Sequence, residues 1–188
     1  MTNFRNKLNN KGSMSILYVI LILTAAIMIL GFMSIAMKSI TMNEIQGILD
    51  TSGVAALRYG VDDVAWRAEE LIVDKSMAKS KFIELVNRNI TPGKLIKDFK
   101  LKEVNIYSSE EVPRSLGISG GSRDQYFLEA IAIATYKSEP MVDAATFNGI
   151  RFFDFLRTNK KEGVSVSGKA GDGNVEVIIR SVSRLVMR

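Results

Sequence analysis

The stretch that decides the fold is residues 16–23, ILYVILIL, an almost unbroken run of aliphatic side chains near the start of the chain. No residue from 12 to 37 is charged, and residues 14–37 contain twelve Ile, Leu, Val or Phe. As a helix these residues reach about 39 Å, which exceeds the roughly 30 Å of hydrocarbon in a bilayer. The sequence therefore predicts one transmembrane helix at residues 13–37, somewhat tilted.

Charge on the N-terminal side of this run predicts the orientation. Arg5, Lys7 and Lys11 precede the apolar run, and no acidic residue does. Because Lys and Arg beside a span are retained on the cytoplasmic side, we expect residues 1–12 to be a basic cytoplasmic leader and the C-terminal domain to be extracytoplasmic. The chain would then be a single-pass protein of the cell membrane.

The overall charge of +5 does not indicate a nucleic-acid partner. Once the three basic residues before the span are set aside, the rest of the chain carries only +2. A nucleic-acid binder needs a concentrated basic patch, and the sequence contains none. We therefore expect no nucleic-acid partner.

Two borders of the apolar run are candidate processing sites. Ser34-Ile35-Ala36 passes as a signal-peptide cleavage site, but the run before it is longer than the roughly 7 to 15 apolar residues of a signal core. The other border is Gly12-Ser13, where the basic leader meets the apolar helix. A plain structural interpretation is also open there, since Gly is common before a helix and Ser is a good N-cap.

Beyond the span, apolar and small residues recur at steps of three and four, which is typical of one face of a helix. The sequence predicts an amphipathic helix over residues 38–73, continuous with the span and bent near Gly47, Gly53 or Gly60. Small residues on the stripe would let another backbone approach closely, so we expect contact with other subunits there. The helix-packing stripe is Met42, Ile45, Leu49, Gly53, Ala56 and Gly60.

The remaining residues, 74–188, predict an extracytoplasmic α+β domain. Residues 75–90 have helical spacing and end at Thr91-Pro92-Gly93. Alternating apolar residues predict strands around residues 104–107 and 126–136 and a hairpin from residues 164–166 to 175–179. Residues 147–156 are ambiguous between strand and helix. The predicted fold is a long N-terminal helix packed on a small antiparallel sheet, with Trp66 on the helix and either packed into the sheet or near the lipid interface.

The residue inventory excludes several kinds of catalytic site. The chain has no cysteine and no histidine, so thiolate and imidazole metal sites and the common nucleophilic triads are excluded. The adjacent carboxylates at residues 62–63, 69–70 and 110–111 point to different sides of a helix or strand, as solvated faces do. We therefore expect no enzymatic activity, no metal and no cofactor.

Two glycine-rich segments have simple structural interpretations. Residues 116–122, LGISGGS, lack the spacing of known phosphate-binding loops, so we interpret them as a flexible connection. Residues 171–174, GDGN, lack the ligand spacing of a calcium loop and lie between two alternating strands. They predict a turn.

The first sixty residues resemble the TadE/TadG-like pilus-assembly proteins, which are similar to type IV pilins. The resemblance rests on Lys11-Gly12-Ser13-Met14-Ser15-Ile16, on the aliphatic run, and on residues 43–57, NEIQGILDTSGVAAL. It implies a pilin-like fold, processing between Gly12 and Ser13 by a prepilin peptidase, and partners among other envelope assembly subunits.

One position departs from this resemblance. Leu17 occupies the fifth position after Gly12, where the family and the pilins usually have a Glu. That Glu is thought to pair with the amine of a neighbouring subunit, because an unpaired charge inside a membrane is costly. The departure favours a minor or assembly component over a major filament subunit. The alternative is a membrane-tethered binding or sensing domain whose helix is only an anchor.

Overall fold

The structure is a computed structural model of the whole chain. It describes the backbone of residues 2–67, 70–93, 96–113, 116, 124–137, 163–169 and 174–186. Side chains are described for the same residues apart from 2–13, 34–35 and 168–169.

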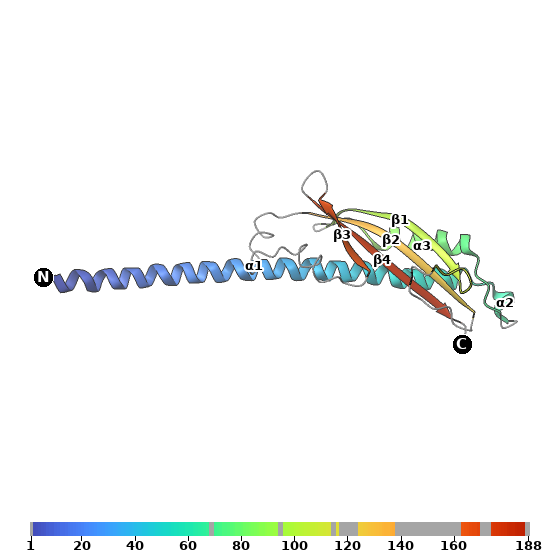
Figure 1. Ribbon diagram of the computed structural model, residues 1–188, viewed down its shortest axis with the longest axis horizontal. Coiled ribbons are helices and arrows are strands. Elements are labelled where there is room, and N and C mark those ends of the chain that lie inside the picture. The colour runs from blue at the N-terminus through green and yellow to red at the C-terminus, as the bar shows by residue number, and fades with distance from the viewer. Residues whose placement is uncertain are drawn as a thin grey trace.

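Helix α1, Thr2–Tyr59, is 58 residues long and is the spine of the molecule. Figure 1 shows that its N-terminal half projects alone, whereas the strands cross its C-terminal half at an angle. The helix begins at Thr2, so Gly12 and Ser13 lie within it and Ser13 is not its N-cap. It continues through Gly47 and Gly53 without interruption.

The predicted extent of the helix to residue 73 is wrong, because α1 ends at Tyr59. The chain turns at Gly60, and Asp62 caps the short helix α2, Asp63–Arg67, by accepting from the backbone N–H groups of Val64 and Ala65. A β-bridge joins Val61 to Val73 and closes this turn. Reversal at Gly60 lets the next helix pack back on α1, and tertiary packing of that kind overrides a continuous apolar pattern.

Helix α3, Lys75–Asn89, confirms the predicted second helix. Its N-cap is Asp74, whose carboxylate accepts from the backbone N–H groups of Ser76 and Met77 and so satisfies two donors that a helix start leaves open. Its buried residues, Ala78, Phe82 and Val86, recur every four positions. That face packs on the C-terminal half of α1.

Four antiparallel strands form one sheet in the order β1-β2-β4-β3. They are β1 (Ile96–Ser108), β2 (Gln125–Tyr136), β3 (Val164–Lys169) and β4 (Val175–Val186). The predicted strands and the predicted hairpin, now β3 and β4, are confirmed. The fold is α+β, with a long apolar N-terminal helix and a small antiparallel sheet, as the sequence predicts.

The core lies between the inner face of the sheet and the two long helices. It joins residues of α1 such as Leu49 and Leu57 to Phe82 of α3 and to Ala132 and Ile179 of the central strands. The described parts of segments 38–73 and 74–188, which the sequence presents as a stalk and a domain, therefore share one core. Residues 147–156, 117–122 and 171–173, which the sequence leaves ambiguous or assigns to loops, lie outside the described residues.

Candidate membrane anchor and assembly surface

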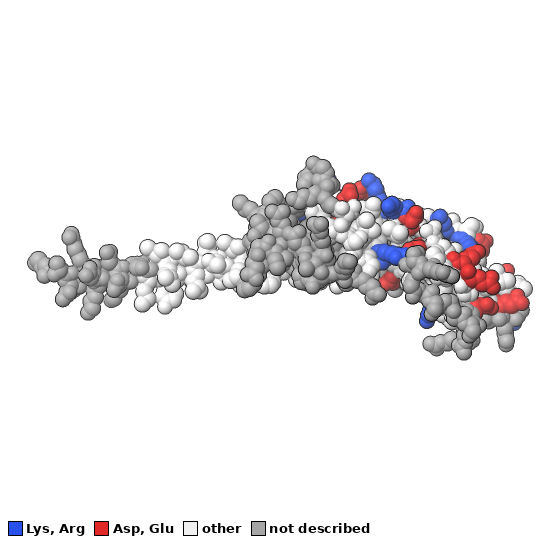
Figure 2. Space-filling model, in the orientation of Figure 1, with Lys and Arg blue, Asp and Glu red and all other residues white. Residues whose placement is uncertain are grey.

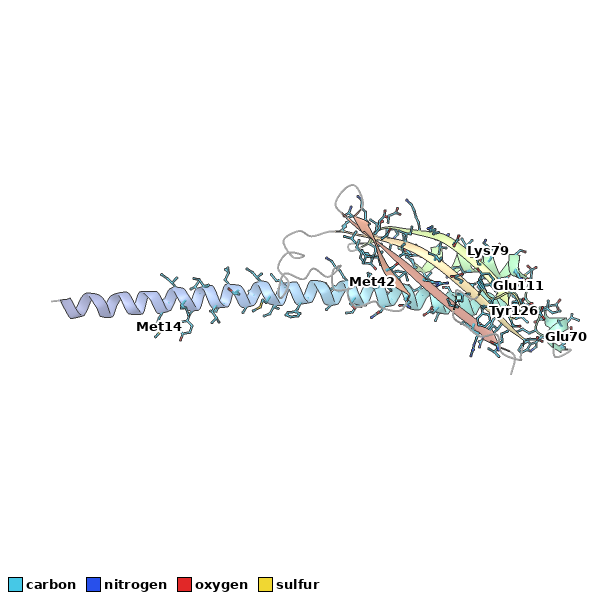
Figure 3. The ribbon with its side chains drawn as sticks, in the orientation of Figure 1. Met14, Met42, Glu70, Lys79, Glu111 and Tyr126 are labelled. Atoms are coloured by element: carbon cyan, nitrogen blue, oxygen red, sulfur yellow. The ribbon has the colours of Figure 1, made fainter. Side chains whose placement is uncertain are left out.

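The N-terminal half of α1 exposes large apolar side chains on every side. From Met14 to Leu23 each large apolar side chain is about 60% exposed, for example Ile16 at 63% and Leu21 at 59%. Figure 3 shows Met14 on the bare part of the helix and Met42 where the sheet begins to cover it. Among the described residues, this is the one helix long and apolar enough to cross a membrane. Water is a poor environment for such a surface, whereas lipid or another apolar helix is a good one.

The folded domain begins immediately after the apolar run. Lys38, the first charged residue after it, is only 1% exposed, and Met42 one turn further on is also 1% exposed. Met42 is the first residue of α1 in the hydrophobic core, so packing of the domain on one face of α1 begins within about a turn and a half of the end of the run. The amphipathic segment is therefore the central element of the domain, and no free stalk separates the domain from the end of the run.

The helix-packing stripe is used within the chain. Met42, Ile45, Leu49 and Ala56 are each at most 2% exposed, and they pack in the core with the sheet and α3. Gly53 and Gly60 are buried too. The stripe does have the close-packing role that its small residues indicate, but the surfaces it contacts belong to this chain.

The two glycines of the stripe allow close approaches of α1 to the sheet and to α3. A Cβ on Gly53 would lie 2.2 Å from Ser183 Oγ and 2.7 Å from Ser183 Cβ, so α1 sits directly on β4. A Cβ on Gly60 would lie 2.9 Å from Ala78 Cβ and from the Asp74 carbonyl oxygen, where α1 meets the start of α3. Contacts this short do not occur for real side chains, so larger residues would push the elements apart.

Polar contacts fix the position of α1 along β4. Ser181 Oγ donates to the carboxylate of Asp50, and Ser183 Oγ donates to the Asp50 carbonyl oxygen at 3.0 Å. Both serines are buried on the inner face of the sheet. Because buried hydroxyls need partners, these bonds specify which turn of α1 faces them.

A second polar cluster lies on the opposite face of the sheet, because strand residues alternate and Leu128 and Ala130 face the core. Glu129 is 6% exposed, and its Oε1 accepts from Arg180 Nε at 2.7 Å. Tyr107 donates its hydroxyl to Glu129 Oε2 at 3.2 Å. Burial and then the charge of Glu129 raise the pKa of Tyr107.

The Tyr107–Glu129–Arg180 cluster joins strands β1, β2 and β4 side by side. Arg180 Nη2 also lies 2.5 Å from Glu129 Oε1, so the buried carboxylate has a guanidinium partner on the neighbouring strand. The sequence patterns considered above do not predict this cluster. The available signal was a single acidic residue, Glu129, inside the otherwise apolar run of residues 126–136.

An open cavity of about 260 Å³ lies between α1 and the chain that follows α3. Its lining is mixed, with isoleucines from both sides and the carboxylate of Glu44. Glu44 is the only ionisable side chain in the lining, which gives no acid–base pair. Across the part of the chain that the structure describes, no three acidic side chains come together as a metal site. The expectations of no enzyme activity and no cofactor stay predictions.

Trp66 lies neither in the sheet nor near the apolar run. It belongs to α2 and is 44% exposed. Figure 1 places α2 at the end of the molecule opposite to the N-terminus. The interpretation that Trp66 packs into the sheet is therefore wrong, because the turn at Gly60 carries Trp66 outward to the tip; its position relative to a lipid interface stays a prediction.

Comparison with known proteins gives no match: no family model, no curated protein and no solved structure is similar to this chain at a significant level. The likeness to TadE/TadG-like proteins therefore rests on the motifs of the first sixty residues. Arg5, Lys7, Lys11, Gly12 and Ser13 all lie on the first turns of α1, and processing at Gly12 stays a prediction.

Proposed function

We propose that this chain is a structural component of an envelope pilus or secretion assembly, of the minor pilin-like or TadE-like kind. It would cross the cell membrane once, with residues 1–12 in the cytoplasm and the α+β domain outside. The observation that carries the proposal is the division of α1 into a bare apolar half and a half that is the spine of the domain. Because the same helix forms the anchor and the spine of the domain, the position of the anchor fixes the position of the α+β domain.

The surface for neighbouring subunits would be the bare half of α1. The stripe from Met42 to Gly60 is occupied by the chain's own sheet and α3, so it is not free for another subunit. Residues 14–33 expose apolar side chains around the whole helix, and a neighbouring transmembrane helix can pack on them. Leu17, which replaces the usual Glu, is 62% exposed within this surface. A component without that charge would join an assembly by packing alone.

The test is the mature N-terminus of the protein. The full chain is expressed in membranes with and without a prepilin peptidase, and intact-mass spectrometry determines the first residue. The proposal predicts a chain that starts at Ser13 only when the peptidase is present. A chain that keeps Met1 under both conditions would remove the support for the pilin-like assignment.

A second candidate is a membrane-tethered binding or sensing domain with α1 as a simple anchor. Occupation of the helix-packing stripe by the same chain favours it, since the domain then needs no neighbour to complete its core. Replacing residues 14–33 with an unrelated apolar helix discriminates between the two. An anchor would tolerate the exchange, whereas an assembly component would lose co-purification with other envelope subunits while its domain stays folded.

A further inference from the structure

The end of the molecule farthest from the bare helix carries exposed apolar side chains. Val64 is 78% exposed, Trp66 is 44% exposed and Ile72 is 47% exposed. We name these three residues the tip patch. Figure 3 shows the neighbouring Glu70 at the extreme end of the molecule, opposite to Met14. A tryptophan left this exposed on a protruding element is unusual, because burial of large aromatic side chains stabilises folds and interfaces alike.

The backbone beneath the tip patch is held in place. The Val61–Val73 bridge closes the turn, and the Asp62 N–H donates to the Ile72 carbonyl oxygen at 2.9 Å. The Asp62 carboxylate caps α2, and Ala65 between the two exposed residues is buried. Val64 and Trp66 therefore flank an anchored residue and project to either side of a short helix. A preorganised projection of this kind loses little conformational freedom when it binds.

Charge around the tip patch is predominantly acidic. Residues 62–70 contain four acidic residues and one basic residue, Arg67. Asp62, Asp63 and Glu70 are exposed. Figure 2 shows that the acidic surface gathers at this end of the molecule, whereas the described part of the bare helix is uncharged.

We propose that the tip patch docks into a partner protein, in an apolar pocket bordered by Lys and Arg side chains. An apolar anchor with an acidic rim complements such a pocket, and aromatic anchors with complementary charge are typical of the strongest contributions to an interface. An anionic lipid surface does not fit, because the acidic rim would be repelled from it. A second copy is less well suited: the only charged side chain in the lining of one described cavity is Glu44, and in the other the positive charge of Arg58 is accompanied by Asp50.

This proposal does not depend on processing at Gly12 or on membership of a pilus assembly. It concerns the opposite end of the molecule from the membrane helix. A membrane-anchored protein with a binding surface at its distal end would hold a partner at a fixed distance from the membrane. This holds for either of the two candidate functions.

The test is photo-crosslinking of the full chain in the membranes of intact cells. A photoreactive amino acid replaces Val64, whose side chain is almost free of protein contacts, and the matched control places it at the exposed Lys79 of α3. The expected product at position 64 is an adduct with a different protein. Its crosslinked peptide, identified by mass spectrometry, should carry apolar residues beside Lys or Arg.

Two variants make the test specific. Trp66→Ser should lower the adduct yield roughly tenfold or more, and so should Asp63→Lys combined with Glu70→Lys. Thermal unfolding of both variants checks the fold, and the charge reversal changes only exposed side chains. The proposal is overturned by a yield at position 64 no higher than at position 79, by adducts with lipid or with this chain alone, or by insensitivity to the charge reversal.

Discussion

The two halves of α1 have similar apolar side chains and opposite environments. Leu21 in the N-terminal half is 59% exposed, whereas Leu49 in the C-terminal half is 0% exposed. Both are leucines within the same uninterrupted helix. The difference arises because the sheet and α3 cover only the second half. Helical structure alone therefore does not decide whether an apolar residue stabilises the domain or is left for lipid.

The same contrast separates what each half contributes to stability. The second half is part of the domain core, so its side chains are protected by this chain's own residues. The first half gains its favourable environment only from a membrane or from other helices. Changes in the first half should thus alter insertion, and changes in the second half should alter folding.

The largest expected effect comes from removing the same side chain in each half. Leu49→Ala should lower the free energy of unfolding of the domain by about 3 kcal/mol, because it leaves a cavity in the core. Leu21→Ala should change it by less than about 0.5 kcal/mol. Denaturant unfolding of the protein in detergent micelles, followed by the fluorescence of Trp66, measures both. Equal costs for the two variants would contradict the division of α1.

A charged residue introduced into the first half of α1 should weaken membrane insertion and leave the folding of the domain unchanged. Leu21→Arg should oppose insertion by about 3 kcal/mol, because a charged side chain at the centre of a span is costly. The control is Ala55→Arg on the exposed side of the second half. Carbonate extraction of membranes reports insertion, and thermal unfolding reports the domain. If Leu21→Arg unfolded the domain but left insertion intact, the assignment of insertion to the first half and folding to the second half would be contradicted.

Two glycines sharpen the comparison within the second half. Gly53→Ala should destabilise the domain by about 1–3 kcal/mol, since the added Cβ collides with Ser183. Gly47→Ala should stabilise it by about 0.5–1 kcal/mol, because nothing lies within 4 Å of the new Cβ and alanine favours a helix. Thermal unfolding should shift in opposite directions. Shifts of the same sign would mean that α1 is not seated on β4 as described.

The smallest expected effect is a pH dependence confined to the domain. The backbone N–H of Met77, then the hydroxyl and N–H of Ser76, lower the pKa of Asp74. A carboxyl with a lowered pKa stabilises the fold above its unfolded value of about 4, and this contribution is lost as the pH falls through the folded pKa. Residues 14–43 contain no acidic residue, so acid should leave the bare helix unaffected.

Asp74→Asn isolates this titration. Asparagine also caps a helix, so the variant should stay folded near neutral pH while its thermal stability falls less steeply below about pH 4. Circular dichroism of wild type and variant over the same pH series measures the difference. Identical acid profiles would show that Asp74 does not contribute.

Much of the fold could be predicted because local patterns agree with it. The second helix has both its cap, Asp74, and its helical apolar spacing, and the strands alternate apolar and polar residues as half-buried strands do. The end of α1 at Tyr59 could not be predicted in this way. The apolar pattern continues past Gly60, and only the packing of α3 on α1 makes reversal favourable at that residue.

The sequence likewise indicates some features of the candidate surfaces, whereas others depend on the tertiary structure. The small residues Gly53 and Gly60 correctly indicate close packing, but a single sequence does not say against which backbone they pack. Glu129 and Arg180 are 51 positions apart, so their pairing depends on the register of two strands. Exposure of Trp66 depends on where the chain turns, which no local pattern records.

The sequence by itself determined the uncharged apolar run, the basic residues before it and the periodicities that specify helices and strands, because these depend on side chains near one another along the chain. The tertiary structure alone decided which half of α1 is buried, which surfaces the stripe contacts and which residues form the tip. Those outcomes depend on long-range contacts, in which residues distant in the sequence compete for the same apolar surface.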